Sequence, residues 1–178
     1  MKSNIEIKTL EIAGFVGVFK SLRLPFGKDC RSECIWTGTN AGSQSIYNLD
    51  ERDLKLLSTL VKRGDEHAKA IRGLIVYAEI NAPRFFWVEA DTYRIGSERL
   101  SSESTMHIQG HGMNTDELVK MKSELKEGTM QRRVQYFSYQ TLRRIYYQRK
   151  DHRLPHWHEF CAWIETLPYA KELILCLD

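Results

Sequence analysis

The chain has 178 residues, enough for one domain to bury its own core without disulfides or a structural metal. Hydrophobic residues at 42% and charged residues at 28% are ordinary globular values, and they exclude an intrinsically disordered chain. The net charge of +3 suits an anionic small ligand but is too weak to indicate binding to bulk nucleic acid. We therefore expect a single domain spanning residues 1–178.

The sequence carries no signal for a membrane or for secretion. No apolar run approaches the roughly 20 residues that span a bilayer. Residues 1–19 include Glu6 and Glu11 and lack a small-residue cleavage site, so they do not resemble a signal peptide. We expect a cytoplasmic protein that contacts no membrane.

The four cysteines are expected to be free thiols, because thiols stay reduced in the cytoplasm. A zinc site at Cys30 and Cys34 is the less favoured alternative, since the second half of a metal-binding pattern is missing. The other two cysteines are Cys161 and Cys176.

The first half of the chain begins with residues 5–20. Their loose alternation of apolar and polar residues, together with their glycines, is typical of a strand. Residues 24–48 are rich in Gly, Ser, Thr and Asn and are expected to form a long functional or mobile loop. Asp50 is a good N-cap for a helix with leucines at helical spacing, which Gly64 ends. Residues 73–80 are short, β-branched and aromatic, which predicts a buried strand.

The second half is expected to be mostly helical. Pro83 favours a helix over residues 84–95, and residues 101–113 are expected to be a loop. Further helices are predicted over residues 114–126 and 138–149 and from Pro155 onwards. The first is expected to carry Leu118, Met121 and Leu125 on one face, and the last an apolar face of Trp157, Phe160, Cys161 and Ile164. One or two buried strands with several helices indicate an α+β fold, with a small sheet packed against the helices.

Residues 57–107 hold short motifs in a distinctive order. A helix and a buried strand precede residues 82–85 (APRF), and residues 92–97 (TYRIGS) and 101–107 (SSESTMH) follow. This order resembles the core of the flavin-dependent thymidylate synthases, whose signature is Arg-His-Arg, two residues and Ser, then a loop with Glu or Gln, Ser, Arg and Tyr. Residues 138–149 are similar to the family's helix that ends in a substrate-binding arginine. The region of His67, the helix at residues 91–93 and the ending at residues 157–160 also resemble uncharacterised phage and prophage proteins, which we take to be an offshoot.

The resemblance implies a subunit with the family's α+β fold, a homotetramer whose sites are assembled from several subunits, and a nucleotide ligand. In the family, FAD carries hydride between a nicotinamide cofactor, a folate one-carbon donor and dUMP, while the protein supplies positioning and charge. For this chain, FAD is therefore a candidate cofactor.

Matched by position, four residues are expected to hold the phosphate or ribose of the nucleotide. Arg94 and Ser97 match the signature's last arginine and its serine, and Ser104 matches the serine of its second half. Arg149 matches the later substrate arginine. Arginine suits this role because it grips phosphate with two parallel charge-assisted bonds.

Base and cofactor contacts follow from the same resemblance. Glu89 sits where the family has a substrate-contacting glutamine and Tyr93 lies one helical turn later, so the pair is expected to read the base. Arg94 is also an implied flavin contact, together with His67, which precedes the position of a flavin-contacting histidine. No catalytic residue is assigned.

The chain departs from the signature at several positions. Thr92 and Tyr93 stand in place of its first arginine and histidine, and Met106 and His107 replace the closing Arg-Tyr. Losing two arginines that face the phosphate lowers the affinity for dUMP by something like 10²–10⁴-fold. A pocket at the same place with a different specificity is therefore expected.

Structural interpretations compete with some of these roles. Glu89 and Tyr93 can be an ordinary hydrogen-bonded pair on a solvated helix face, and Arg94 can bridge subunits or pair with an acid. Ser104 can lie in a solvent-exposed turn, and Arg149, on the apolar stripe of its helix, can pair with a buried acid or lie between subunits. The cluster of His152, His156 and His158 invites a metal site, but exposed histidines are the favoured interpretation because residues two apart on a helix point to different sides. The basic pairs at residues 132–133 and 143–144 lie among tyrosines, and packed aromatics with outward arginines are favoured over nucleic-acid stacking.

Three functional hypotheses remain. The first is a flavin-dependent enzyme that methylates dUMP or a related pyrimidine nucleotide. The second is a non-catalytic phage protein that sequesters a nucleotide, for example a defence signal. The third is a purely structural or interaction protein. The sequence favours nucleotide binding and leaves catalysis undecided.

Overall fold

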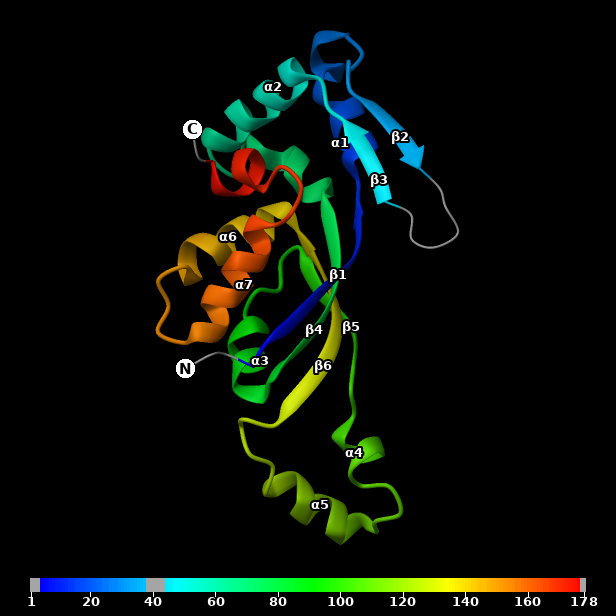
Figure 1. The fold of residues 1–178 in the computed structure, drawn as a ribbon, viewed down its shortest axis with the longest axis vertical. Coiled ribbons are helices and arrows are strands. Elements are labelled where there is room, and N and C mark those ends of the chain that lie inside the picture. The colour runs from blue at the N-terminus through cyan, green and yellow to red at the C-terminus, as the bar shows by residue number, and fades with distance from the viewer. Residues whose placement is uncertain (1–3, 38–43, 177–178) are drawn as a thin grey trace.

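The structure, a computed structural model, describes residues 4–37 and 44–176; for residues 33–37 and 44–48 it describes the backbone alone. A four-stranded antiparallel sheet forms the centre, in the order β1 (Glu6–Ala13), β4 (Ile75–Pro83), β6 (Met130–Ser138) and β5 (Ser97–Ser102) (Figure 1). A hairpin of β2 (Glu33–Thr37) and β3 (Gln44–Asn48) forms a separate sheet. The fold is α+β, as the sequence predicts.

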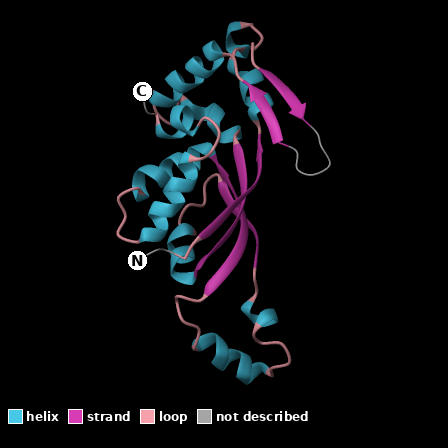
Figure 2. Ribbon diagram, in the orientation of Figure 1, coloured by secondary structure: helices cyan, strands magenta, loops and turns pink. Residues whose placement is uncertain are grey.

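Helices connect the strands, and some of them cover one side of the large sheet. In chain order they are α1 (Phe15–Leu22), α2 (Glu51–Lys62), α3 (Arg84–Ala90), α4 (Thr105–Ile108), α5 (Thr115–Ser123), α6 (Tyr139–Arg149) and α7 (Pro155–Glu165). Shorter turns are η1 (Leu24–Phe26), η2 (Ala68–Gly73) and η3 (Lys171–Leu175). Figure 2 shows α3, α6 and α7 on the same side of the sheet. No helix within the described ranges is long and apolar enough to cross a membrane.

The two faces of the large sheet differ, as strand β4 shows. Val76, Ala78 and Ile80 alternate along it and are fully buried, so they define the covered face, which packs on the helices. Tyr77 and Glu79 point to the opposite, half-exposed side, which we call the open face.

Aromatic side chains fill the core under the covered face. The ring centroid of Phe86 on α3 lies 4.6 Å from that of Trp157 and 6.0 Å from that of Phe160, both on α7. Trp157 and Phe160 are buried together with Cys161 and Ile164, which confirms the apolar face predicted for this helix.

Several local predictions are confirmed. The N-cap Asp50 accepts from the backbone nitrogen of Arg52 at 2.9 Å, and α2 ends at Lys62, two residues before Gly64. The buried strand β4 and the helices α6 and α7 also form where the sequence predicts them.

The prediction that residues 5–20 form a strand is wrong in its second half. The strand ends at Ala13, and α1 follows after Gly14, whose φ of +99° few other residues tolerate. Phe15 and Phe19 then lie one helical turn apart, on the buried side of α1. The long loop predicted for residues 24–48 is wrong as well, because it contains the β2–β3 hairpin.

The predictions are also wrong around strands β5 and β6. The helix predicted over residues 84–95 ends at Ala90, and β5 begins at Ser97. Residues 101–113 are not simply a loop, because they include the end of β5 and the short helix α4. No strand is predicted at β6, although β6 pairs along its length with β4 and also with β5.

Residues 103–129 form a segment that projects from the ends of β5 and β6 (Figure 1), which we call the projecting segment. It contains α4 and α5, and α5 has no fully buried residue. Asn114 and Glu117 form a reciprocal capping box at its start. Leu118, Met121 and Leu125 are half-buried, in agreement with the predicted apolar face.

A buried carboxylate joins α2 to the chain that precedes the hairpin. Asp53 is fully buried and accepts from the Arg23 guanidinium, from the backbone nitrogens of Arg31 and Ser32, and from the Ser32 hydroxyl. Burial acts to raise the pKa of Asp53, but these hydrogen bonds outweigh it and hold the pKa below its usual range.

Candidate functional site

Three of the predicted ligand residues meet at the C-terminal end of α6. Arg149 donates from Nη1 to Oε2 of Glu89 at 2.6 Å and from Nε to the Tyr93 hydroxyl at 2.8 Å. Trp157 donates from Nε1 to the same Glu89 oxygen at 2.9 Å, and its ring centroid lies 4.6 Å from the Arg149 guanidinium carbon. The charge of Arg149, whose side chain is 17% exposed, is thus balanced within the chain.

Tyr93 lies between this network and a surface hollow. Together with Arg94 and Ser97 it lines a space of about 520 Å³, which we call the large hollow. The structure therefore brings three predicted residues to one hollow and connects it through Tyr93 to two more, Glu89 and Arg149. The remaining lining residues are Asp91, Glu98, Arg99, Gln135 and Tyr136.

The start of α6 fixes the turn that carries Arg94 and Ser97. Gly96 has a φ of +76°, and a Cβ there would lie 2.6 Å from the hydroxyl oxygens of both Ser138 and Thr141. Thr141 donates from Oγ1 to the carbonyl before Gly96 at 2.6 Å, and the backbone nitrogen of Ser138 donates to the Gly96 carbonyl at 2.7 Å. The Ser97 hydroxyl donates to a carbonyl within the turn, so this buried side chain holds the turn in place.

A smaller hollow of about 240 Å³ adjoins the large hollow and shares Asp91 and Arg99 with it. We call it the arginine pocket, because Arg84 on α3 and Arg133 on β6 line it together with Arg99 on β5. The remaining lining residues are Trp87, Val88 and Gln131. The two hollows together carry four arginines against two carboxylates, a balance that favours an anionic ligand.

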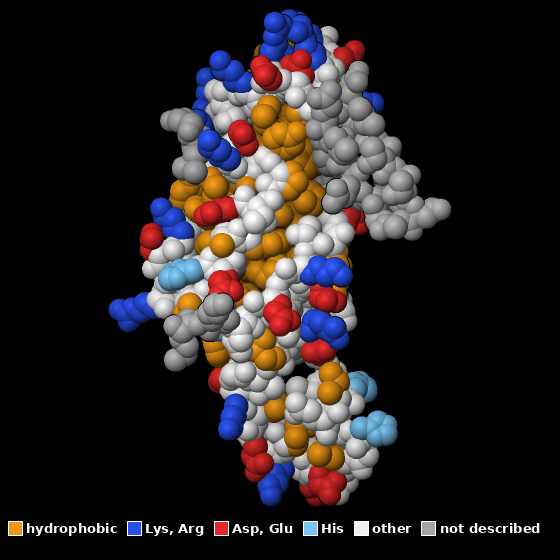
Figure 3. Space-filling view, viewed as in Figure 1, with side chains coloured by type: hydrophobic (Ala, Val, Ile, Leu, Met, Phe, Trp, Pro, Cys, Tyr) orange, Lys and Arg blue, Asp and Glu red, His pale blue; other side chains and the backbone are white. Residues whose placement is uncertain are grey.

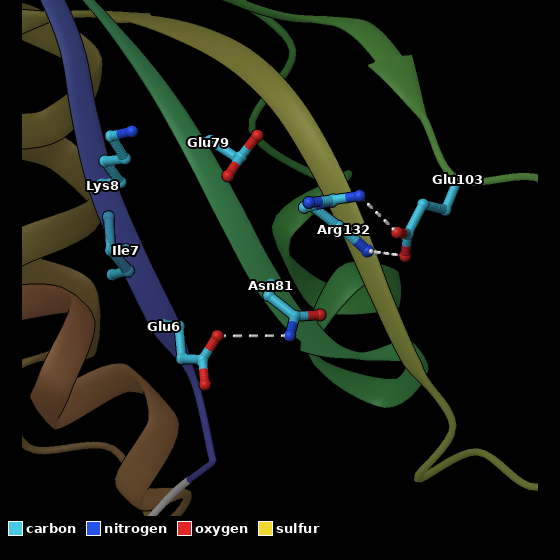
Figure 4. A pocket seen from close by; sticks show the side chains of 7 residues that line it. All are labelled: Glu6, Ile7, Lys8, Glu79, Asn81, Glu103 and Arg132. Atoms are coloured by element: carbon cyan, nitrogen blue, oxygen red, sulfur yellow. Dashed lines mark hydrogen bonds and ion pairs between the residues drawn. The ribbon is translucent and has the colours of Figure 1, made fainter.

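A third hollow, of about 470 Å³, lies on the open face of the sheet (Figure 4). Arg132 pairs there with Glu103 at 2.9 Å, and Asn81 donates to Glu6 at 3.4 Å. With three carboxylates against two cations, this hollow does not favour an anion. The remaining lining residues are Ile7, Lys8 and Glu79.

No family model and no curated protein matches the sequence. Two crystal structures of thymidylate synthase X from Helicobacter pylori, both with FAD and dUMP, are similar to the chain with a TM-score of 0.67 and 13% sequence identity. One similarity covers 98% of this chain and 99% of that chain, and the other covers 97% and 100%. The chain has the flavin-dependent thymidylate synthase fold.

Within this thymidylate synthase fold, two predicted residues lie away from the large hollow. Ser104 precedes α4, beyond the end of β5, and it lines none of the three hollows. His67 is exposed before η2 and also lines none of them. Their roles as ligand contacts remain predictions.

Sequence reasoning missed the arginines of the arginine pocket as site residues. The expectation that both arginines of residues 132–133 point outward is wrong for Arg133, whose side chain is 7% exposed. Neighbouring residues on a strand point to opposite faces, so Arg132 lies on the open face and Arg133 on the covered face. Recognition of β6 as a strand would have separated the two.

The prediction that the clustered histidines are exposed is wrong for His156. His156 is 8% exposed, its Nε2 lies 2.9 Å from Oδ1 of Asn4, and burial lowers its pKa. His158 is exposed, as predicted. Among the side chains that the structure describes, no group of three or more His, Cys, Asp or Glu could hold a metal. The alternative zinc site at Cys30 and Cys34 stays a prediction, because the side chain of Cys34 is not among those that the structure describes.

Proposed function

We propose that the protein binds a pyrimidine nucleotide of the dUMP type in the large hollow, acting as a single domain within a homotetramer. The observation that carries the proposal is the convergence of Tyr93, Arg94 and Ser97 on one hollow of about 520 Å³, a volume typical of small-molecule sites. Arg94 and Arg99 form no ion pair with any residue in the described ranges, so their charges are available to an anion.

Three of the lining residues have a direct chemical role in this proposal. Arg94 holds the phosphate with charge-assisted hydrogen bonds, while Tyr93 and the amide of Gln135 read the base. Glu89 and Arg149 do not line the large hollow and act on the nucleotide through Tyr93, whose hydroxyl accepts from Arg149. Ser104 contacts the nucleotide of a neighbouring copy. The dUMP in the two similar Helicobacter pylori structures supports this ligand class.

FAD is the proposed cofactor, held between copies of the chain. The similar structures contain it, and Arg94 is free of any ion pair within the described residues. His67 is exposed and lines no hollow together with Arg94, so a single copy does not bring these two contacts to one cavity. When bound, FAD would supply hydride transfer, and the chain's own residues would supply binding and orientation.

Assembly into a tetramer is supported by uncovered apolar surface. In Figure 3, hydrophobic side chains gather in a band along the middle of the molecule, flanked by charged groups. Leu10 on β1 is 47% exposed, and the rings of Tyr77 and Tyr136 lie 6.0 Å apart on the open face.

A second candidate function is nucleotide sequestration without catalysis, as in a diverged phage protein. The pairing of Arg149 with Glu89 favours it, because the arginine expected to grip substrate is neutralised by a carboxylate of its own chain. Thr92 and Tyr93, which replace an arginine and a histidine of the signature, also favour it.

Calorimetric titration with dUMP tests the proposal. We expect saturable binding to the full chain that weakens about tenfold or more in Arg94→Gln, because a charge-assisted bond contributes about 1.5–3 kcal/mol. Arg63→Gln, an exposed arginine at the end of α2, should bind as the parent does. Absence of any dUMP binding would overturn the proposal.

An absorbance spectrum after incubation with FAD separates the two candidates. A retained flavin spectrum, and methylation of dUMP when a folate one-carbon donor and a reduced nicotinamide cofactor are supplied, support the enzyme. Nucleotide binding by a colourless protein supports sequestration.

A further inference from the structure

We infer that the arginine pocket is a binding site for a phosphate oxyanion, separate from the nucleoside part of the large hollow. Three guanidinium groups from three elements meet there, and Asp91 is the single carboxylate among the lining residues. The inference does not require nucleotide binding in the large hollow.

Arg133 is the fixed centre of the pocket. Its guanidinium carbon lies 4.3 Å from the ring centroid of Trp87, and its Nη1 lies 2.7 Å from Oδ1 of Asp91. Trp87 is in turn fixed, because its Nε1 donates to the Gln131 carbonyl at 2.9 Å. A charge held in place in this way needs no rearrangement to receive a ligand.

The other two arginines bring charge that the described residues do not balance. Arg84 and Arg99 form no ion pair in the described ranges, and the buried Nε of Arg84 has no hydrogen-bond partner there. A buried donor without a partner costs free energy, which an oxyanion would recover.

The electrostatics of Arg133 agree with this geometry. Burial lowers the pKa of Arg133, Asp91 acts in the opposite direction, and the nearby charges of Arg99 and Arg84 lower it further. The three cations therefore repel one another, and a bound anion would relieve that repulsion.

The size and the donors favour phosphate. Planar guanidinium groups bind phosphate through two parallel hydrogen bonds. A volume of about 240 Å³ is below the usual range for a drug-sized ligand but accommodates one or two phosphate groups. The shared Arg99 and Asp91 make the pocket continuous with the large hollow, so the phosphate can be inorganic or belong to the chain of a nucleotide.

Calorimetric titration of the full chain with inorganic pyrophosphate at constant ionic strength tests the inference. We expect one site per chain, an affinity about tenfold or more lower in Arg84→Gln, and unchanged binding in Arg63→Gln. Arg99→Gln, on the exposed edge strand, provides a second variant if Arg84→Gln does not fold. No pyrophosphate binding, or equal binding by both pocket variants and the parent, would overturn it.

Two further titrations distinguish the sources of the phosphate. If the pocket takes the chain of a nucleotide, deoxyuridine diphosphate should bind more tightly than dUMP, and Arg84→Gln should remove the difference. If it takes inorganic phosphate, pyrophosphate should bind equally well with dUMP already present. Because Arg84 lines only the arginine pocket and Arg94 only the large hollow, loss of dUMP binding with retained pyrophosphate binding would reject the proposed function alone.

Discussion

Arg149 donates from Nη1 to Oε2 of Glu89 across 2.6 Å, although the two residues lie 60 positions apart in the chain. The same carboxylate oxygen accepts from Trp157, and His152 Nε2 lies 3.4 Å from it. In the proposed function, Glu89 therefore sets how much of the Arg149 charge acts on a nucleotide in the adjoining large hollow.

Replacing Glu89 with glutamine should strengthen the binding of dUMP. The amide keeps a hydrogen-bond acceptor for Arg149 but removes a negative charge that repels the phosphate, so we expect a gain of about three- to tenfold in affinity. Calorimetric titration measures it. Glu159→Gln, an exposed position on α7, is the matched control and should leave the affinity unchanged. Equal affinities for Glu89→Gln and the parent would mean that Arg149 does not act on the ligand.

Asp53→Asn should destabilise the protein by roughly 3 kcal/mol at pH 7, because it leaves Arg23 facing an uncharged group in a buried position. Burial acts to raise the pKa of Asp53, but the hydrogen bonds outweigh it and lower the pKa in the folded state, so its contribution is fully present above the ordinary pKa range of aspartate and is lost as the pH falls through the lowered pKa. Urea unfolding between pH 3 and 7 should show the parent approaching the variant at the acidic end. Asp29→Asn, which is exposed, should follow the parent throughout.

Gly96→Ala should unfold about 2 kcal/mol more easily than the parent. The residue has a φ of +76°, and the added Cβ would meet the hydroxyls of Ser138 and Thr141 at 2.6 Å. Gly128→Ala is the matched control, since nothing lies within 4 Å of a Cβ there. Thermal unfolding of both variants checks the prediction, and comparable losses in the two would contradict it.

Cys161 should resist thiol reagents in the folded protein. Burial, with smaller effects of Glu165 and Asp151, raises the pKa of its thiol to about 12, and the residue is 4% exposed. Because the thiolate is the reactive form, removal of the thiol in Cys161→Ser should leave the fast-reacting fraction unchanged at pH 8. Removal of the partly exposed Cys30 should reduce that fraction. A fast phase lost in Cys161→Ser would contradict the assigned burial.

The elements that the sequence predicts correctly are those whose signals are local. Helix α2 has its cap at Asp50 and its stop at Gly64, and α7 has a proline at its start and aromatic residues at helical spacing. These features do not depend on distant parts of the chain.

Strand β6 was missed because its covered face is polar at the site. Arg133 and Gln135 occupy positions where a half-buried strand normally carries apolar residues, so the alternation that identifies strands is broken. The partners of Arg133 are Trp87 on α3 and Asp91 directly after this helix, and both lie more than forty positions away in the chain. The two residues that break the strand pattern thus line the two hollows, Arg133 the arginine pocket and Gln135 the large hollow.

The motif around Arg94 gave the position of the large hollow, because a continuous stretch of chain forms much of its wall. It did not give the partner of Arg149, since hydrogen bonding between separate helices leaves no periodic signal. The sequence likewise has no local signal for the hydrogen bonds that Asp53 accepts from Arg23 and from the chain before β2.

Strand β6 pairs with β4 on one side and with β5 on the other, whereas the loop near Gly112 in the projecting segment is exposed. A single cut there would divide the polypeptide into one piece with β1, β4 and β5 and another with β6, α6 and α7, yet the interstrand ladder would still join them. The two pieces, produced separately, should reassemble by complementation. The scaffold is therefore suited to a split reporter, in which two fused partners bring its halves together.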